Sequence, residues 1–262
     1  MINAIVIILA SLSVLVLLYI ILSGKKKPGR QFQQILEKDR NLLQQYVSFY
    51  NQLDKQKQPE FEDRMQHFLS TVRITGINTE VERLDQLLIA ASAIIPIFGF
   101  HNWQYMNLNE VLLYPASFGE LFNQEGDERT RAGIVGDGPY QNIMILSKHD
   151  LRQGFINSDS KYNTGIHEFV HLIDKTDGAV DGIPETLIGK QYVLPWLKLM
   201  QQNIQRIRED QSDINPYGAT NEAEFFAVVS EYFFERPDLL QQNHPELYGL
   251  LEQIFKQQLV KY

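Results

Sequence analysis

The chain has 262 residues, of which 44% are hydrophobic and 11% aromatic, which is ordinary for a globular enzyme of one sizeable domain or two small ones. It contains no cysteine, which excludes a disulfide framework and thiolate metal ligands and leaves His, Asp and Glu as the strong ligands. The net charge of −8 is uneven: residues 1–30 hold four basic and no acidic side chains, so residues 31–262 carry −12. Phosphate backbones would repel this acidic body, which disfavours nucleic-acid binding.

The first apolar segment is long enough to cross a membrane. Residues 2–23 form 22 positions without a charged side chain, dominated by Ile, Leu and Val. At a rise of about 1.5 Å per residue, such a helix crosses a hydrocarbon core of about 30 Å. Four basic side chains follow within residues 25–30, and the positive-inside bias places them in the cytoplasm. We therefore expect residues 1–24 to be a single-pass membrane anchor, touching the bilayer through residues 2–23, with the body of the chain on the cytoplasmic side.

A cleaved signal peptide is the alternative for this segment. It would have a basic region before a shorter apolar core and a small-residue cleavage site. Here the basic cluster follows the apolar core, and residues 22–24 match a cleavage site poorly. The pattern favours an uncleaved anchor.

The next segment, residues 25–58, is expected to be a basic juxtamembrane stretch and a membrane-proximal helix. Residues 31–53 carry a broad apolar stripe at helical spacing, with a Gln-rich, charged face opposite. That face is most simply a solvated surface, and a partner-binding coiled coil is the alternative. Residues 59–262 are then the main domain.

Within the main domain, hydrophobic periodicity predicts more helix than strand. The expected helices are 59–69, a buried apolar helix over 84–98 broken by Pro96, 196–208 and 222–234, and the expected strands are 72–77, 111–114 and 143–146. The segment between the last two strands, about 119–139, contains Gly and charged residues and is expected to be a loop. These elements predict an α+β fold, mainly helical, with a small sheet.

Residues 167–171 read His-Glu-Phe-Val-His, within a segment that Thr164 can cap and Gly178 can end as a helix. In a helix, His167 and His171 project from one face and can hold one metal ion, while Glu168 points into the same cleft. The pattern is typical of zinc hydrolases. The alternative is two ordinary histidines on the surface of an amphipathic helix.

A catalytic zinc needs a third protein ligand, and the extended motif with a third His is missing after His171. The downstream candidates are Glu185, Glu222, Glu224, Glu231, Glu235 and His244. Asn221 can cap the helix over 222–234, and Glu224 and Glu231 share one face of that apolar helix, where an unpaired carboxylate would be costly.

Other roles for these carboxylates stay open. Glu224 could instead be a capping-box residue that bonds back to Asn221. Glu231 fits a support for a histidine ligand or a partner for an Arg. Asp174, one turn beyond His171, is a candidate for orienting a ligand, or else a surface helix charge.

Several blocks of this sequence resemble the Mlc titration factor A family of zinc-dependent peptidases. The similar blocks are 111–118, 145–147, 167–174, 181–184 and 217–231, so that the likeness extends over about residues 60–255. The family in turn resembles the catalytic domain of anthrax lethal factor, which implies a zincin-like fold with the sheet beside the motif helix. Residues 59–262 are accordingly expected to be a zinc metallopeptidase domain.

The resemblance also implies roles for individual residues. It assigns Zn²⁺ to His167, His171 and Glu224, the general base to Glu168, and stabilisation of the oxyanion to Tyr217, which lies seven residues before Glu224. On spacing alone, Tyr217 would be read as a loop aromatic. His67, His101, His149 and His244 have no spacing that suggests a shared site.

The expected function is therefore a membrane-anchored zinc peptidase acting on a peptide or protein. The resemblance suggests aminopeptidase activity, and cleavage of membrane-near proteins at internal bonds is the other option. The alternative function is a membrane-tethered protein that binds and sequesters a cytoplasmic regulator. Because the best-known family members are soluble, their regulatory partner does not carry over directly to this chain.

Overall fold

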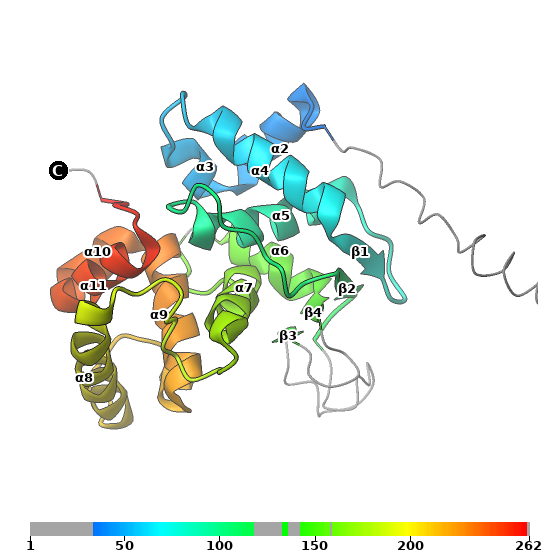
Figure 1. The fold of residues 1–262 in the computed structure, drawn as a ribbon. Coiled ribbons are helices and arrows are strands. Elements are labelled where there is room, and N and C mark those ends of the chain that lie inside the picture. Colours follow the sequence, from blue (N-terminus) through cyan, green and yellow to red (C-terminus); the bar gives the residue numbers. More distant parts are fainter. Residues whose placement is uncertain (1–33, 118–132, 136–141, 158, 261–262) are drawn as a thin grey trace, which may run out of the picture. The chain divides into compact units, whose positions relative to one another are not determined.

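A computed structural model describes residues 34–117, 133–135, 142–157 and 159–260 (Figure 1). These residues belong to one compact unit, Gln33–Tyr262. The expected membrane anchor and the basic cluster after it lie outside the described residues. In the part of the chain that is described, none of the helices is both long enough and apolar enough for a bilayer crossing.

The unit is mainly helical, as the sequence predicts. Its helices are α2 (Glu37–Tyr46), α3 (Ser48–Gln52), α4 (Gln58–Thr71), α5 (Arg83–Ile97), α6 (Lys148–Ile156), α7 (Thr164–Asp174), α8 (Lys190–Arg208), α9 (Glu222–Glu235), α10 (Pro237–Asn243) and α11 (Pro245–Phe255). Two short 3-10 helices, η2 (Lys175–Asp177) and η3 (Pro216–Ala219), follow α7 and precede α9.

A small sheet of four strands accompanies the helices, in the order β1-β2-β4-β3. Its strands are β1 (Arg73–Gly76), β2 (Glu110–Tyr114), β3 (Gly133–Val135) and β4 (Ile143–Ser147). The first, second and fourth strands pair in parallel, and β3 pairs antiparallel to β4 at the end of the sheet. The three parallel strands were predicted. The strand β3 lies within the segment predicted to be a loop, because three residues with one glycine carry too little alternation to be recognised.

Helix α5 is the centre of the core. Every side chain from residue 87 to residue 97 is buried, and the helix contacts α4, α6 and α7. Gly165 of α7 allows the close approach, because a Cβ at this position would overlap the hydroxyl of Ser92 in α5. The predicted break at Pro96 is wrong: α5 continues to Ile97, because a proline in the last turn removes only one hydrogen bond near the helix end.

The N-terminal helices pack on this same core. The stripe over residues 31–53 forms two helices, α2 and α3, separated at Val47, instead of one. Leu43, Val47 and Tyr50 are buried in the common hydrophobic core. Buried acids hold the helices in place: Asp39 pairs with Arg83 at the start of α5, and Tyr50 donates a hydrogen bond of 2.7 Å to Glu62 of α4.

The C-terminal half is built around α9. Every residue from 225 to 234 is buried, and five of these ten are aromatic, so that packing leaves this helix little freedom to move. Helix α9 lies beside α7, and α7 also contacts β3 and β4 (Figure 1). The motif helix is thus placed between the sheet and α9. Helix α8 begins at Lys190, earlier than the predicted residue 196, and α6 was not predicted.

Candidate metal centre

Helix α7 presents the two motif histidines on its less buried side. Its first residue is Thr164, and the cap is Asn163, whose Oδ1 accepts the N–H of Ile166 at 3.2 Å. The predicted cap, Thr164, is therefore wrong by one position, whereas the predicted stop is confirmed, because Gly178 follows η2 with φ of +100°. Apolar side chains such as Phe169 are fully buried on the opposite face. Packing of that face fixes the direction of both imidazoles.

Helix α9 brings Glu224 to these histidines. The Oε2 atom of Glu224 lies 3.0 Å from Nε2 of His167 and 3.4 Å from Nε2 of His171, and the two Nε2 atoms are 3.0 Å apart. Asn221 caps α9 by accepting the backbone N–H of Glu224 at 2.9 Å. The cap and the cluster are thus compatible: the main chain of Glu224 completes the helix start while its carboxylate faces the histidines.

The spacing of these three atoms fits a small metal ion. Ligands at the usual Zn–N and Zn–O distances of about 2.0–2.1 Å, in tetrahedral geometry, lie about 3.3 Å from one another. The three separations, between 3.0 and 3.4 Å, agree with this value. Two imidazoles and one carboxylate also form a donor set that suits zinc and leaves a fourth position for water. The residues therefore fit the metal that the sequence pattern predicts.

The charges around the cluster favour a cation. Burial opposes ionisation of Glu224, but hydrogen bonds from His167 and His171 outweigh it and hold the pKa of this carboxyl far below its usual value. Burial also opposes charge on His167, yet Glu231 and Glu224 raise its pKa well above the usual range. The same negative potential that favours a proton on this ring would favour a metal ion beside it.

Glu231 lies behind the first histidine. Its Oε1 atom is 2.7 Å from Nδ1 of His167, and the Glu231 carboxyl is almost completely buried. With Nδ1–H as donor, the lone pair of Nε2 faces Glu224 and His171, which is the arrangement a histidine ligand needs. The geometry matches the support role suggested by helix spacing and not a pairing with Arg.

Glu168 is buried beside the edge strand. A Cβ at Gly133 of β3 would overlap the side chain of Glu168, so this strand can approach only because position 133 is a glycine. Burial raises the pKa of the Glu168 carboxyl, and His167 and His171 act in the opposite direction. A carboxyl group with a raised pKa, next to a candidate metal cluster, is suited to take up a proton. The importance of Gly133 was not visible in the sequence.

Tyr217 lies next to the cluster. It belongs to η3, which Asn215 caps, and its ring centroid is 6.1 Å from that of His167. Its side chain is 51% exposed, so the ring faces open space as well as the histidine. Gly218 packs on Val228 of α9 and ties η3 to that helix. The structure thus places the ring of Tyr217 beside His167, which spacing alone did not suggest.

Asp174 lies one turn beyond His171 but does not bond to a histidine. Its Oδ2 atom accepts the N–H of Gly182 at 2.8 Å, and its Oδ1 atom is buried without a hydrogen-bond partner among the described residues. Gly182, at φ of +76°, packs closely against the carbonyl of Glu222, and Trp196 donates to its carbonyl at 2.7 Å. Asp174 therefore holds the loop around Gly182, which lies beside the start of α9, through this hydrogen bond.

The remaining candidates lie outside the three-ligand cluster. Glu185 and Glu222 are exposed, Glu235 accepts a hydrogen bond from Asn163, and His244 lies 2.6 Å from Asp213. His67, His101 and His149 are exposed on the surface. Among the described residues, the one group able to hold a metal ion is that of His167, His171 and Glu224.

The comparisons with known proteins agree with this architecture. The sequence profile of the glucose-regulated metallo-peptidase M90 family matches residues 24–256, and the chain therefore belongs to this family. It is thus a member of a class of metal-dependent peptidases.

Individual relatives narrow the likeness further. The chain is 30% identical to Mlc titration factor A of Escherichia fergusonii over 224 residues, which cover 80% of this chain and 83% of the relative. It is 32% identical to Mlc titration factor A of Serratia proteamaculans over 165 residues, or 57% and 60% of the two chains. An uncharacterized protein of Synechocystis, slr2042, is 31% identical over 227 residues, or 82% of each chain. The family resemblance predicted from the sequence blocks is confirmed.

The environment of Asp174 predicts a pH dependence of stability. Burial raises the pKa of this carboxyl to about 6, although the hydrogen bond from Gly182 lowers it. Because the folded-state pKa lies above the unfolded value of about 3.9, the resulting stabilisation is complete below about pH 4 and is lost as the pH rises through about 6. The difference between about 6 in the folded state and about 3.9 in the unfolded state corresponds to at most about 3 kcal/mol in the free energy of unfolding.

Asp174→Asn keeps an oxygen for the N–H of Gly182 and cannot ionise. We expect the free energy of unfolding of the wild type, relative to this variant, to fall between pH 4 and pH 7. Urea unfolding of both proteins across this range measures the difference. A difference that does not change with pH would contradict the assignment.

Proposed function

We propose that the protein is a zinc-dependent peptidase in which His167, His171 and Glu224 hold the metal and Glu168 is the general base. The observation that carries the proposal is the convergence of three ligand atoms, from two helices, at separations that suit one zinc ion. Membership of a metallopeptidase family supports it independently.

The roles of the side chains follow from their positions. A zinc ion bound here would polarise a scissile carbonyl and lower the pKa of a water molecule to about 7. The buried Glu168 carboxylate would accept the proton of the attacking water and pass it to the leaving amine. The hydroxyl of Tyr217 would donate a hydrogen bond to the developing oxyanion. Glu231 would hold the ring of His167 through Nδ1.

The decisive variant is Glu168→Gln. It keeps the size of the side chain but cannot accept the proton, so we expect the turnover of a peptide substrate to fall by a factor of about 100 or more. Metal analysis of the purified protein should still find one zinc ion per chain. Cleavage at the wild-type rate by this variant would reject the scheme.

His167→Ala is the matched control for the metal. Loss of one of three protein ligands should remove both zinc and activity, whereas Glu168→Gln should remove activity alone. If His167→Ala retained zinc at the wild-type level, the metal would be held elsewhere and the proposed ligand set would be wrong.

The position of the cleaved bond is a separate question. The family resemblance suggests an aminopeptidase, which must recognise a free amino terminus. We expect a peptide with a free terminus to be cleaved and its N-acetylated form to be spared, as measured by chromatography of the products. Equal cleavage of both peptides would instead support hydrolysis of internal bonds.

We also propose that residues 2–23 anchor the enzyme in a membrane, with the catalytic unit on the cytoplasmic side. The 22 uncharged residues, with four basic residues following directly, support this topology. The full chain should sediment with membranes, and residues 31–262 should not. Release of the full chain by high salt alone would argue for a peripheral contact.

A second candidate function is the binding of a cytoplasmic regulatory protein. Relatives carry the name Mlc titration factor A, and this supports a binding partner in addition to a substrate. The partner would remain bound to Glu168→Gln and to protein treated with a chelator, because neither change alters the outer surface. Binding that is lost with the metal would instead indicate that the partner is recognised as a substrate.

A further inference from the structure

Asn163 lies at the first turn of the motif helix and is completely buried. All four of its polar groups form hydrogen bonds. Its carbonyl accepts the N–H of His167 at 2.9 Å, and its Oδ1 accepts the N–H of Ile166 at 3.2 Å. Its own N–H donates to Oε2 of Glu231 at 2.6 Å, and its Nδ2 donates to Oε1 of Glu235 at 2.7 Å. One side chain therefore caps α7 and connects that helix to α9.

The two carboxyl groups bound by Asn163 are four residues apart in α9. Residues at this spacing lie on the same face of a helix, one turn apart. Asn163 thus binds α9 at two points along its axis, and one of these points, Glu231, is also bound to Nδ1 of His167. This arrangement opposes both sliding and rotation of α9 against the start of α7. The third candidate ligand, Glu224, lies about two turns earlier in the same helix.

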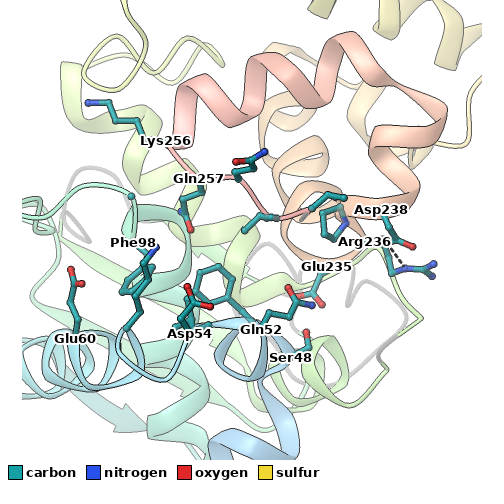
Figure 2. A pocket seen from close by; sticks show the side chains of 18 of the residues that line it. Ser48, Gln52, Asp54, Glu60, Phe98, Glu235, Arg236, Asp238, Lys256 and Gln257 are labelled. Carbon is teal, nitrogen blue, oxygen red and sulfur yellow. Dashed lines mark hydrogen bonds and ion pairs between the residues drawn. The ribbon is translucent and has the colours of Figure 1, made fainter. Parts of the chain in front are cut away.

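The Asn163 side chain is closely packed on one side, and its partner Glu235 faces a hollow on the other. A Cβ on Gly154 of α6 would lie 3.0 Å from both Cα and Cγ of Asn163, so the glycine permits the close packing of α6 on the cap. Glu235 itself lines a hollow of about 1220 Å³ between α3, the end of α5, α10 and residues 256–260 (Figure 2). The series of hydrogen bonds that begins at His167 and passes through Glu231 and Asn163 thus ends at Glu235, on the surface of a hollow that water can enter.

The protonation state of Glu235 is compatible with a role as the hydrogen-bond partner that anchors Asn163. Burial raises the pKa of its carboxyl to about 8, helped by the charge of Glu231 and opposed by the hydrogen bond from Asn163. Near neutral pH this group is mostly a neutral acid that accepts one hydrogen bond. The link to Asn163 therefore adds no second buried charge next to Glu231, and a neutral amide could take the place of the acid.

We propose that Asn163 is a positioning residue of the metal centre, which, anchored by Glu235, holds Glu231 against Nδ1 of His167 and fixes α9 relative to α7. The inference rests on the proposed function, because it assigns a support to the proposed zinc ligand His167. Loss of the group directly behind a metal-binding histidine, here Glu231, typically changes metal affinity by 10–100-fold. The Asn163 side chain acts one contact further out, through its bond to Glu235, so we expect its loss to fall at the lower end of that range.

The test uses variants that keep the helix cap. Asn163→Ser retains an oxygen that can cap α7 but cannot reach Glu235, and Ser is as good an N-cap as Asn. Glu235→Leu cuts the same link from the other side without touching the cap. Glu235→Gln restores it, because the amide oxygen accepts the hydrogen bond of Asn163. The zinc dissociation constant of each protein is measured by competition with a chelating dye, and urea unfolding of the metal-free proteins reports stability.

We expect Asn163→Ser and Glu235→Leu each to weaken zinc binding by about tenfold, and Glu235→Gln to stay within about twofold of the wild type. The double variant Asn163→Ser, Glu235→Leu should be no weaker than either single variant, because both remove one shared link. The unfolding midpoint of the metal-free Asn163→Ser protein should stay close to that of the wild type, since a merely structural role would change stability and not zinc affinity.

Unchanged zinc affinity in Glu235→Leu would overturn the proposal, even if Asn163→Ser failed to fold. Additive losses in the double variant would overturn it as well. A wild-type protein that does not bind zinc would refute the proposed function itself, and the two failures are therefore distinguishable.

Discussion

The candidate metal site depends on the packing of α7 against α9, because α7 carries the two histidines and α9 carries Glu224. The aromatic rings of α9 fix its far side, because Phe225 and Phe226 contact Trp196 of α8 and Phe233 stacks on Phe255 of α11. The face of α9 that carries Glu224 and Glu231 forms the interface with α7. Within it, His167, Glu224 and Glu231 form a polar cluster that would be costly to bury if any member lacked a partner. The cluster is satisfied only when the two helices meet at one register. The same packing that buries the aromatic rings therefore assembles the candidate ligands.

A second constraint is the position of the loop that connects α8 to α9, because this loop carries Tyr217. The segment before η3 is held at Asp213, which receives hydrogen bonds from Lys161, Tyr232 and Asn243 and lies 2.6 Å from a ring nitrogen of His244. These bonds lower the pKa of Asp213 despite its partial burial, so the carboxylate remains charged at neutral pH. Asp213 lies four residues before Tyr217. A fixed loop thus delivers Tyr217 to the side of His167.

Sequence reasoning predicted the site best where short-range geometry carries the information. The spacing of His167 and His171 in one helix determines that they share a face, and the cap at Asn221 places Glu224 in the first turn of α9. Whether Glu224 would cap its own helix or turn to the histidines was open, because both outcomes fit the same local pattern. The contact with a helix more than fifty residues away in the sequence decides between them.

The failures have the same physical origin. Segments distant in the sequence pack closely against Gly133 and Gly182, and Asn163 bonds to a distant helix. The local sequence around a glycine or a capping residue does not indicate such a contact. Thr164 was predicted as the cap of α7, whereas Asn163 is the observed cap. Both residue types are good helix caps, and the hydrogen bonds of Asn163 to Glu231 and Glu235 of α9 favour Asn163.

The sequence by itself determined the parts that depend on local periodicity and composition: the motif helix, the apolar helices of the core, the parallel strands, the absence of thiolate ligands and the family resemblance. Helix spacing left open which carboxylate meets the histidines, although the resemblance implied Glu224, and the tertiary structure decided it. The tertiary structure also decided which carboxylate lies behind His167 and where β3 and the loop at Gly182 pack. The reason is that these contacts join residues distant in the chain, and their energy comes from burial and hydrogen bonding that exist only after the helices have packed.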